Sequence, residues 1–140
     1  MSLAAKPLFI ELSKSEFVNV AIIDEQHQTL GELLNELFEL LGANKPETVK
    51  FLMNRLVEHL KTHFETEEKL MKDLNYINFF SHKMEHDRFL SKIVDFQEYI
   101  RDDKGKLNLE LLKSCKNWFH NHIELNDRKL GVFLTENNIH

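Results

Sequence analysis

One stretch of the sequence, residues 46–74, constrains the fold more than any other. Its core-facing positions recur at alternating spacings of three and four, which places them on one face of a long α-helix. These positions are Val49, Met53, Leu56, Leu60, His63, Glu67, Leu70 and Leu74. A buried carboxylate is costly unless it is paired, protonated or bound to a metal. His63 and Glu67 therefore predict that this helix packs around a polar or metal-containing centre.

The same spacing predicts three further helices, at about residues 23–42, 79–101 and 108–136. Short polar segments separate the helices, so neighbouring helices should be antiparallel. The predicted fold class is all-α, an antiparallel up-down-up-down four-helix bundle. Residues 1 to about 22 contain apolar groups without a helical period, and we expect them to form an arm packed across the bundle. Each further helix also brings histidines to its core face: His27, His82, His86 and His122.

The helical repeat shifts by one residue after His122. A regular helix would bring Asn126 and Lys129 into the core, whereas the acidic and apolar residues fall one position later, at Asp127 and Leu130. One inserted residue, such as a π-bulge, would return Asp127 to the face of His122, and such bulges are frequent at functional sites. We therefore predict a π-bulge between these two residues.

Composition limits the class of protein. The 140 residues suit a single domain, 1–140, and 42% hydrophobic residues with few glycines and prolines fit a helical protein. A formal charge of -5 argues against nucleic acid, and no apolar run reaches the length of a membrane span. A single cysteine, Cys115, fits a reducing compartment, and no signal peptide is evident. We expect a cytoplasmic protein that contacts neither nucleic acid nor membrane, and no protein partner is inferred.

Seven polar side chains converge in the expected core: His27, His63, Glu67, His82, His86, His122 and Asp127. One such histidine is usually a hydrogen-bonded core residue, but seven groups without a metal would cost about 1–3 kcal/mol each. Imidazole with carboxylate suits iron, zinc, copper or manganese, and the absence of cysteine disfavours a structural zinc site. Seven ligands are too many for one ion, so two ions bridged by the carboxylates are implied. One coordination position on one ion would stay open for a small molecule.

These residues stand in stretches that resemble the hemerythrin family, specifically its bacterial single-domain members. The stretches are Ile-Asp-Glu-Gln-His at 23–27, His-Phe-Glu-Thr-Glu-Glu-Lys-Leu-Met at 63–71, His-Lys-Met-Glu-His at 82–86 and Trp-Phe-His-Asn-His-Ile-Glu-Leu-Asn-Asp at 118–127. Two departures, Leu12 where a tryptophan is common and Ile77 where a proline is usual, lie outside the ligand set.

The resemblance implies a non-haem di-iron centre that binds O2 reversibly, with two Fe2+/Fe3+ ions joined by an oxo or hydroxo bridge. By position, it implies that one iron is fully coordinated, that the other keeps an open position, and that two carboxylates bridge them. The first would be held by His82, His86 and His122, the second by His27 and His63, and both by Glu67 and Asp127.

The expected role is O2 storage, delivery or scavenging, without catalysis and without a cofactor beyond the metal. The paired Glu-x-x-His motifs of ferritin-like di-iron proteins do not occur among the candidate ligands. Two alternatives stay open: an O2- or redox-sensing signalling module, and a di-iron oxidoreductase acting on peroxide or nitric oxide. Phe64, Trp118 and Ile123 are candidates to line the site, and the role of His59 stays open.

Overall fold

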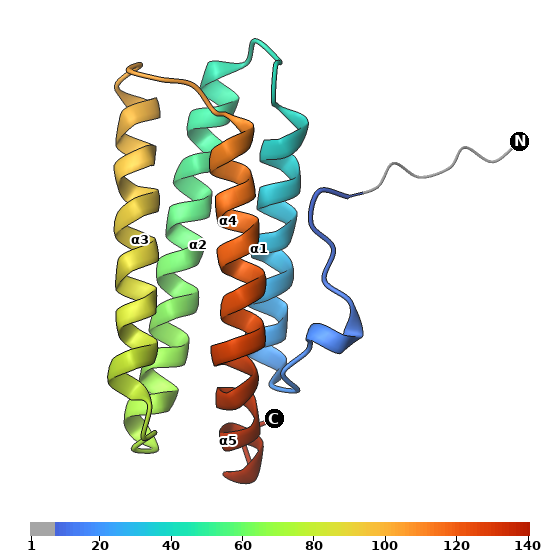
Figure 1. Ribbon diagram of the computed structural model, residues 1–140, viewed down its shortest axis with the longest axis vertical. Coiled ribbons are helices and arrows are strands. Elements are labelled where there is room, and N and C mark those ends of the chain that lie inside the picture. Colours follow the sequence, from blue (N-terminus) through green and yellow to red (C-terminus); the bar gives the residue numbers. More distant parts are fainter. Residues whose placement is uncertain (1–7) are drawn as a thin grey trace, which may run out of the picture.

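The computed structural model describes residues 8–140, so the first seven residues of the predicted arm lie outside the described residues. The helices are α1 (Ala21–Glu39), α2 (Pro46–Asp73), α3 (Phe79–Arg101), α4 (Leu109–His122) and α5 (Arg128–Glu136). A 3-10 turn, η1 (Lys14–Glu16), precedes α1, and a π-helical segment, η2 (Ile123–Asp127), joins α4 to α5. In Figure 1, α1, α2, α3 and α4 run side by side as the rods of the bundle, and α5 continues α4. The predicted all-α four-helix bundle is confirmed.

Proline, asparagine and aspartate residues at the helix ends explain where several helices start and stop. Pro46 occupies the first turn of α2, and Asn108 caps α4 by accepting a hydrogen bond from the backbone N–H of Leu111 at 2.9 Å. Three helices are followed by an Asn or Asp with φ between 55° and 63°, which these side chains tolerate better than most. They are Asn75 after α2, Asp103 after α3 and Asn138 after α5.

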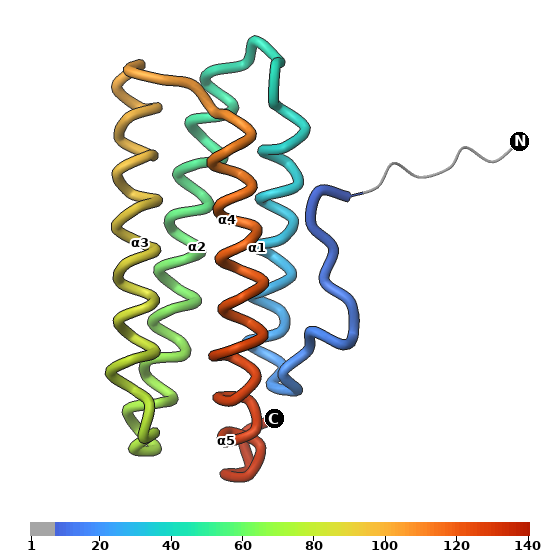
Figure 2. Tube along the Cα trace, in the orientation of Figure 1, coloured from blue at the N-terminus to red at the C-terminus, as the bar shows by residue number. Residues whose placement is uncertain are grey.

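The arm before α1 lies against the bundle, as the tube in Figure 2 shows. The Asn35 side chain accepts a hydrogen bond from the backbone N–H of Ile10 at 2.8 Å and donates one to the Ile10 carbonyl at 2.9 Å. The Asp24 carboxylate accepts a hydrogen bond from the backbone N–H of Val18 at 2.8 Å. Because side chains of α1 satisfy these backbone groups, an irregular segment can pack here with Ile10 and Val18 buried.

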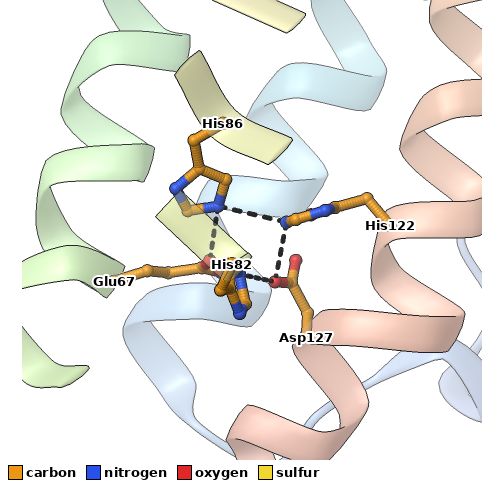
Figure 3. A group of neighbouring side chains, drawn as sticks. All are labelled: Glu67, His82, His86, His122 and Asp127. Carbon is orange, nitrogen blue, oxygen red and sulfur yellow. Dashed lines mark hydrogen bonds and ion pairs between the residues drawn. The ribbon is translucent and has the colours of Figure 1, made fainter. Parts of the chain in front are cut away.

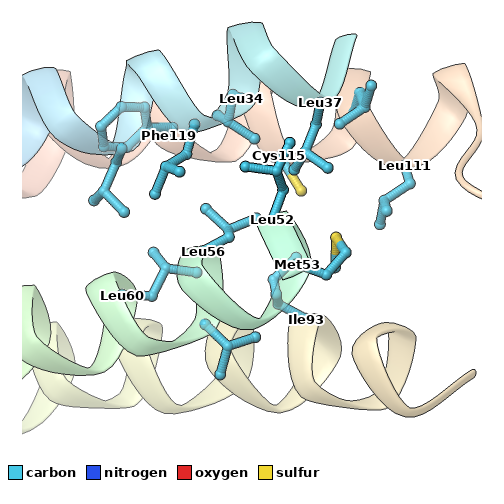
Figure 4. Close-up of a cluster of buried hydrophobic side chains, with 14 of the residues drawn as sticks. Leu34, Leu37, Leu52, Met53, Leu56, Leu60, Ile93, Leu111, Cys115 and Phe119 are labelled. Atoms are coloured by element: carbon cyan, nitrogen blue, oxygen red, sulfur yellow. The ribbon is translucent and has the colours of Figure 1, made fainter. Parts of the chain in front are cut away.

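The buried apolar side chains form two clusters on either side of a polar layer. The larger cluster fills the part of the bundle drawn in Figure 4, which includes Leu34, Met53, Leu56, Ile93, Cys115 and Phe119. The smaller cluster joins the arm to the ends of α2 and α5 and consists of Val18, Val20, Ile23, Met71, Tyr76, Leu130 and Leu134. On α1 the order from one cluster to the other is Ile23, His27 and Leu30. Within residues 8–140, no helix is long and apolar enough to cross a membrane.

Candidate metal centre

All seven side chains that the sequence places in the core meet in one cluster, and each is at most 4% exposed. Their potential ligand atoms form two groups, and within each group the atoms lie within 4.8 Å of one another. The larger group contains Glu67, His82, His86, His122 and Asp127, and the smaller contains His27, His63, Glu67 and Asp127. The two carboxylates belong to both groups.

Figure 3 shows the larger group, whose side chains point toward a common centre from α2, α3, α4 and η2. His82 Nε2 lies 3.0 Å from both Glu67 Oε1 and Asp127 Oδ1. His86 Nε2 lies 3.1 Å from both Glu67 Oε1 and His122 Nε2. Neighbouring ligands of an octahedral ion with bonds of about 2.1 Å are about 3.0 Å apart. The spacing therefore fits five protein ligands around one ion.

The smaller group uses the other oxygen of each carboxylate. His27 Nε2 lies 2.9 Å from Asp127 Oδ2, and His63 Nε2 lies 3.2 Å from Glu67 Oε2. Glu67 and Asp127 thus turn one oxygen toward each group, which is the arrangement of a bridging carboxylate. Because this group has four members and the larger has five, it would leave more of an ion's coordination shell free.

The π-helical segment η2 places Asp127 in the cluster. The segment covers Ile123–Asp127, so the predicted π-bulge after His122 is confirmed. The extra residue turns Asp127 to the inside, where its side chain is fully buried. Asn126, which a regular helix would carry into the core, instead approaches the outer nitrogen of His122, with Nδ2 3.0 Å from Nδ1.

Several buried atoms of the cluster lack a hydrogen-bond partner within residues 8–140. They include His63 Nε2, Glu67 Oε2 and Asp127 Oδ1. His63 Nε2 and Glu67 Oε2 are only 3.2 Å apart, yet the two groups are not aligned for a hydrogen bond. Since buried polar groups almost always have a partner, these orphaned atoms fit a bound cation. The imidazole and carboxylate donors suit a transition metal such as iron.

The charges of the cluster also favour a cation. Burial, and for Glu67 the charge of Asp127, acts to raise the pKa values of the two carboxyls, but the surrounding imidazoles outweigh this and hold both pKa values well below the ordinary range. Burial lowers the pKa of His82, but the adjacent carboxylates of Asp127 and Glu67 outweigh it and raise this pKa to about 9. For His63, burial outweighs the nearby carboxylates and lowers the pKa. The carboxylates are therefore ionised and ready to bind metal at neutral pH.

Three residues that contact the outer nitrogens of candidate ligand histidines were not predicted. Gln26 Oε1 lies 2.8 Å from His63 Nδ1, and Glu68 Oε2 lies 2.9 Å from His86 Nδ1. Asn126 is the third, at His122. Gln26 and Asn126 each directly precede a candidate ligand and Glu68 directly follows one. Their position next to a candidate ligand could have suggested that they lie near the site. It does not show which histidine each side chain contacts.

Aromatic and apolar side chains surround the cluster. Phe64 stacks on His86 with ring centroids 4.0 Å apart, Trp118 stacks on His122 at 4.4 Å, and Ile123 is 1% exposed. Phe119, which was not predicted to line the site, meets His27 edge-on at 5.4 Å. Two other histidines lie apart: His59 is half-buried and belongs to neither group, and His120 Nδ1 contacts Glu16 of η1 at 2.9 Å.

Fold and cluster together define a class of protein, a four-helix bundle with a buried two-metal site of histidines and bridging carboxylates. The family described as "Hemerythrin HHE cation binding domain" matches residues 18–134. The chain therefore belongs to the hemerythrin family, which confirms the resemblance seen in its sequence. This family membership implies a di-iron centre, which the two ligand groups fit.

Individual relatives agree with this assignment. The bacteriohemerythrin of Clostridium acetobutylicum is 32% identical over 122 residues, covering 83% of this chain and 95% of the relative. That of Methylococcus capsulatus is 26% identical over 117 residues, covering 84% of this chain and 89% of the relative. A crystal structure of wild-type hemerythrin superimposes with a TM-score of 0.84 at 26% identity, covering 88% of this chain and 95% of that chain.

Proposed function

We propose that this chain binds O2 reversibly at two iron ions held by the seven clustered side chains. The observation that carries the proposal is the pair of candidate ligand groups, one with five residues and one with four. Both groups contain the same two carboxylates, Glu67 and Asp127. Bound iron would supply the electrons that reversible O2 binding requires. His82, His86 and His122 would complete one iron, His27 and His63 would hold the iron with the open position, and Glu67 and Asp127 would bridge the two.

The side of the cluster next to Phe119 is apolar. Phe119 packs against His27, and beyond it lies an apolar cavity of about 10 Å³ lined by Leu30, Leu34, Leu56, Leu60, Phe89, Cys115 and Phe119. A buried water molecule needs two to four polar partners, and this apolar lining does not supply them. O2 is small and apolar, so this side of the cluster admits it more readily than water or protons.

We infer that binding, rather than catalysis, is the main role, in storage, delivery or scavenging of O2. Histidines outnumber carboxylates in the candidate ligand set, and the paired Glu-x-x-His motifs of ferritin-like di-iron proteins are absent from it. We further propose that residues 1–140 act as a single domain in the cytoplasm. The buried Cys115, whose thiol pKa burial raises to about 12, suits a reducing compartment.

The test combines iron analysis with visible spectra recorded in air and then under argon. We expect two irons per chain and a charge-transfer band that appears with O2 and disappears when O2 is removed. Protein that holds two irons but shows no O2-dependent band would contradict the proposal. Continuous consumption of peroxide or nitric oxide with a reductant would indicate an enzyme instead.

A further inference from the structure

We propose that Glu68 is a positioning residue that acts through His86 to make the two metal sites electronically unequal. This inference rests on the proposed function, because it takes His86 as a metal ligand through Nε2. His86 directs Nε2 into the larger group, 3.1 Å from Glu67 Oε1. Its Nδ1 points to the outside of the cluster, where Glu68 Oε2 lies 2.9 Å away. With a metal on Nε2, Nδ1 carries the remaining ring proton and donates a hydrogen bond to this carboxylate.

The other outer partners of the ligand histidines are neutral. His63 Nδ1 meets the amide oxygen of Gln26 at 2.8 Å, and His122 Nδ1 meets the side-chain amide of Asn126 at 3.0 Å. With Nε2 on a metal, His122 would donate from Nδ1, so the Asn126 amide would turn its oxygen inward. His27 Nδ1 has no hydrogen-bond partner within residues 8–140. Among the outer partners in the described part of the chain, Glu68 alone is a carboxylate.

Glu68 is held in place without being fully neutralised. Its side chain is 19% exposed, and Lys83 Nζ lies 3.8 Å from Oε1. The same Nζ lies much closer to Asp87 Oδ2, at 2.8 Å, so Lys83 pairs mainly with Asp87. The negative charge of Glu68 is therefore directed at the imidazole of His86.

A charged acceptor at Nδ1 makes Nε2 a stronger metal donor, because it draws the Nδ1 proton away from the ring. A stronger donor favours Fe3+ over Fe2+. At the other site, the amide oxygen of Gln26 attracts the Nδ1 proton of His63 more weakly because an amide carries no net charge. Glu68 thus lowers the reduction potential of the site that His86 serves, which is the site without the open position.

The test compares Glu68→Gln with Glu65→Gln. Glu68→Gln keeps the shape of the acceptor and removes its charge, whereas exposed Glu65 lies on the same helix and belongs to neither ligand group. Glu68→Gln should shift the reduction potential of the iron-loaded protein to a more positive value and weaken metal binding by about 10- to 100-fold. Glu65→Gln should leave both unchanged. Glu68→Asp, which retains the charge at a shorter reach, should give an intermediate potential.

A second readout uses zinc-loaded protein, which does not depend on O2 binding. The proton NMR resonance of His86 Nδ1–H should move upfield in Glu68→Gln and stay in place in Glu65→Gln. Potentials and resonances that are the same in both variants would overturn the proposal. If Glu68→Gln does not fold, the reduction potential of Glu68→Asp decides. A shift from the wild-type potential would support the proposal, and an unchanged potential would overturn it. A wild-type protein without an O2-dependent band would contradict the proposed function, while the zinc experiment would still decide the role of Glu68.

Discussion

At the scale of single residues, His63 and His59 differ in what they contact although they stand one turn apart on α2. His63 Nε2 lies 3.2 Å from Glu67 Oε2 inside the smaller ligand group, whereas His59 belongs to neither group. His63→Ala should therefore abolish the O2-dependent band while circular dichroism still reports a helical protein. His59→Ala should keep the band. A band that survives in His63→Ala would contradict the assignment of His63 to the open iron.

His82 predicts how metal binding depends on pH. Its pKa in the metal-free fold is about 9, above its ordinary value of 6.5. The stabilisation from protonated His82 is therefore fully present below pH 6.5 and is lost as the pH rises through 9. A metal ion must displace this proton, so zinc affinity should rise at least about tenfold per pH unit between pH 6.5 and 9. Calorimetric titrations in this pH range measure the zinc affinity. An affinity that stays constant or falls as the pH rises would contradict the raised pKa of His82.

The place of the candidate ligands in the core could be predicted from the sequence, but the partners of their outer nitrogens could not. Helical spacing decides which side chains face the core, so His27, His63 and Glu67 could be placed there from position alone. Gln26 and Glu68 stand beside the core face, and which neighbouring helix they reach depends on how the helices pack. Spacing along one helix does not contain that information.

At the scale of elements, Gly131 of α5 marks a close approach between that helix and the arm. A Cβ atom at this position would lie 2.5 Å from the Val18 carbonyl oxygen and 2.8 Å from Val18 Cβ. The backbone of the arm would have to move, so Gly131→Ala should lower the free energy of unfolding by about 1–3 kcal/mol.

Gly31→Ala is the matched control within α1. Its Cβ would find its nearest neighbour, Leu12 Cδ1, at an ordinary 3.7 Å. The better helix propensity of alanine should then stabilise the protein by up to about 1 kcal/mol. Urea unfolding of both variants measures the difference. Equal effects of the two substitutions would contradict the packing of α5 against the arm.

The elements were predictable to different degrees. The segment η2 could be predicted because one residue too many between His122 and Asp127 breaks a regular repeat. The course of the arm could not be, because its apolar residues follow no period. Its position depends on hydrogen bonds with two polar side chains of α1, Asn35 and Asp24. Such long-range contacts leave no pattern in the local sequence.

At the scale of the whole molecule, the polar cluster lies between two apolar clusters and joins all four rods of the bundle. Residues from α1, α2, α3, α4 and η2 contribute to it, so a bound metal pair would cross-link every rod. Metal binding and folding are then coupled, since the assembled site exists only in the folded chain. The shared carboxylates are what make this one centre rather than two.

The measurement that tests the central claim most directly is the stoichiometry of O2 uptake by the reduced, iron-loaded protein. Two bridged irons with one open position predict one O2 taken up for every two irons, and complete release under argon. Uptake of one O2 per iron would contradict a single open position. Irreversible consumption of O2, or none by protein that holds two irons, would contradict a reversible O2-binding centre.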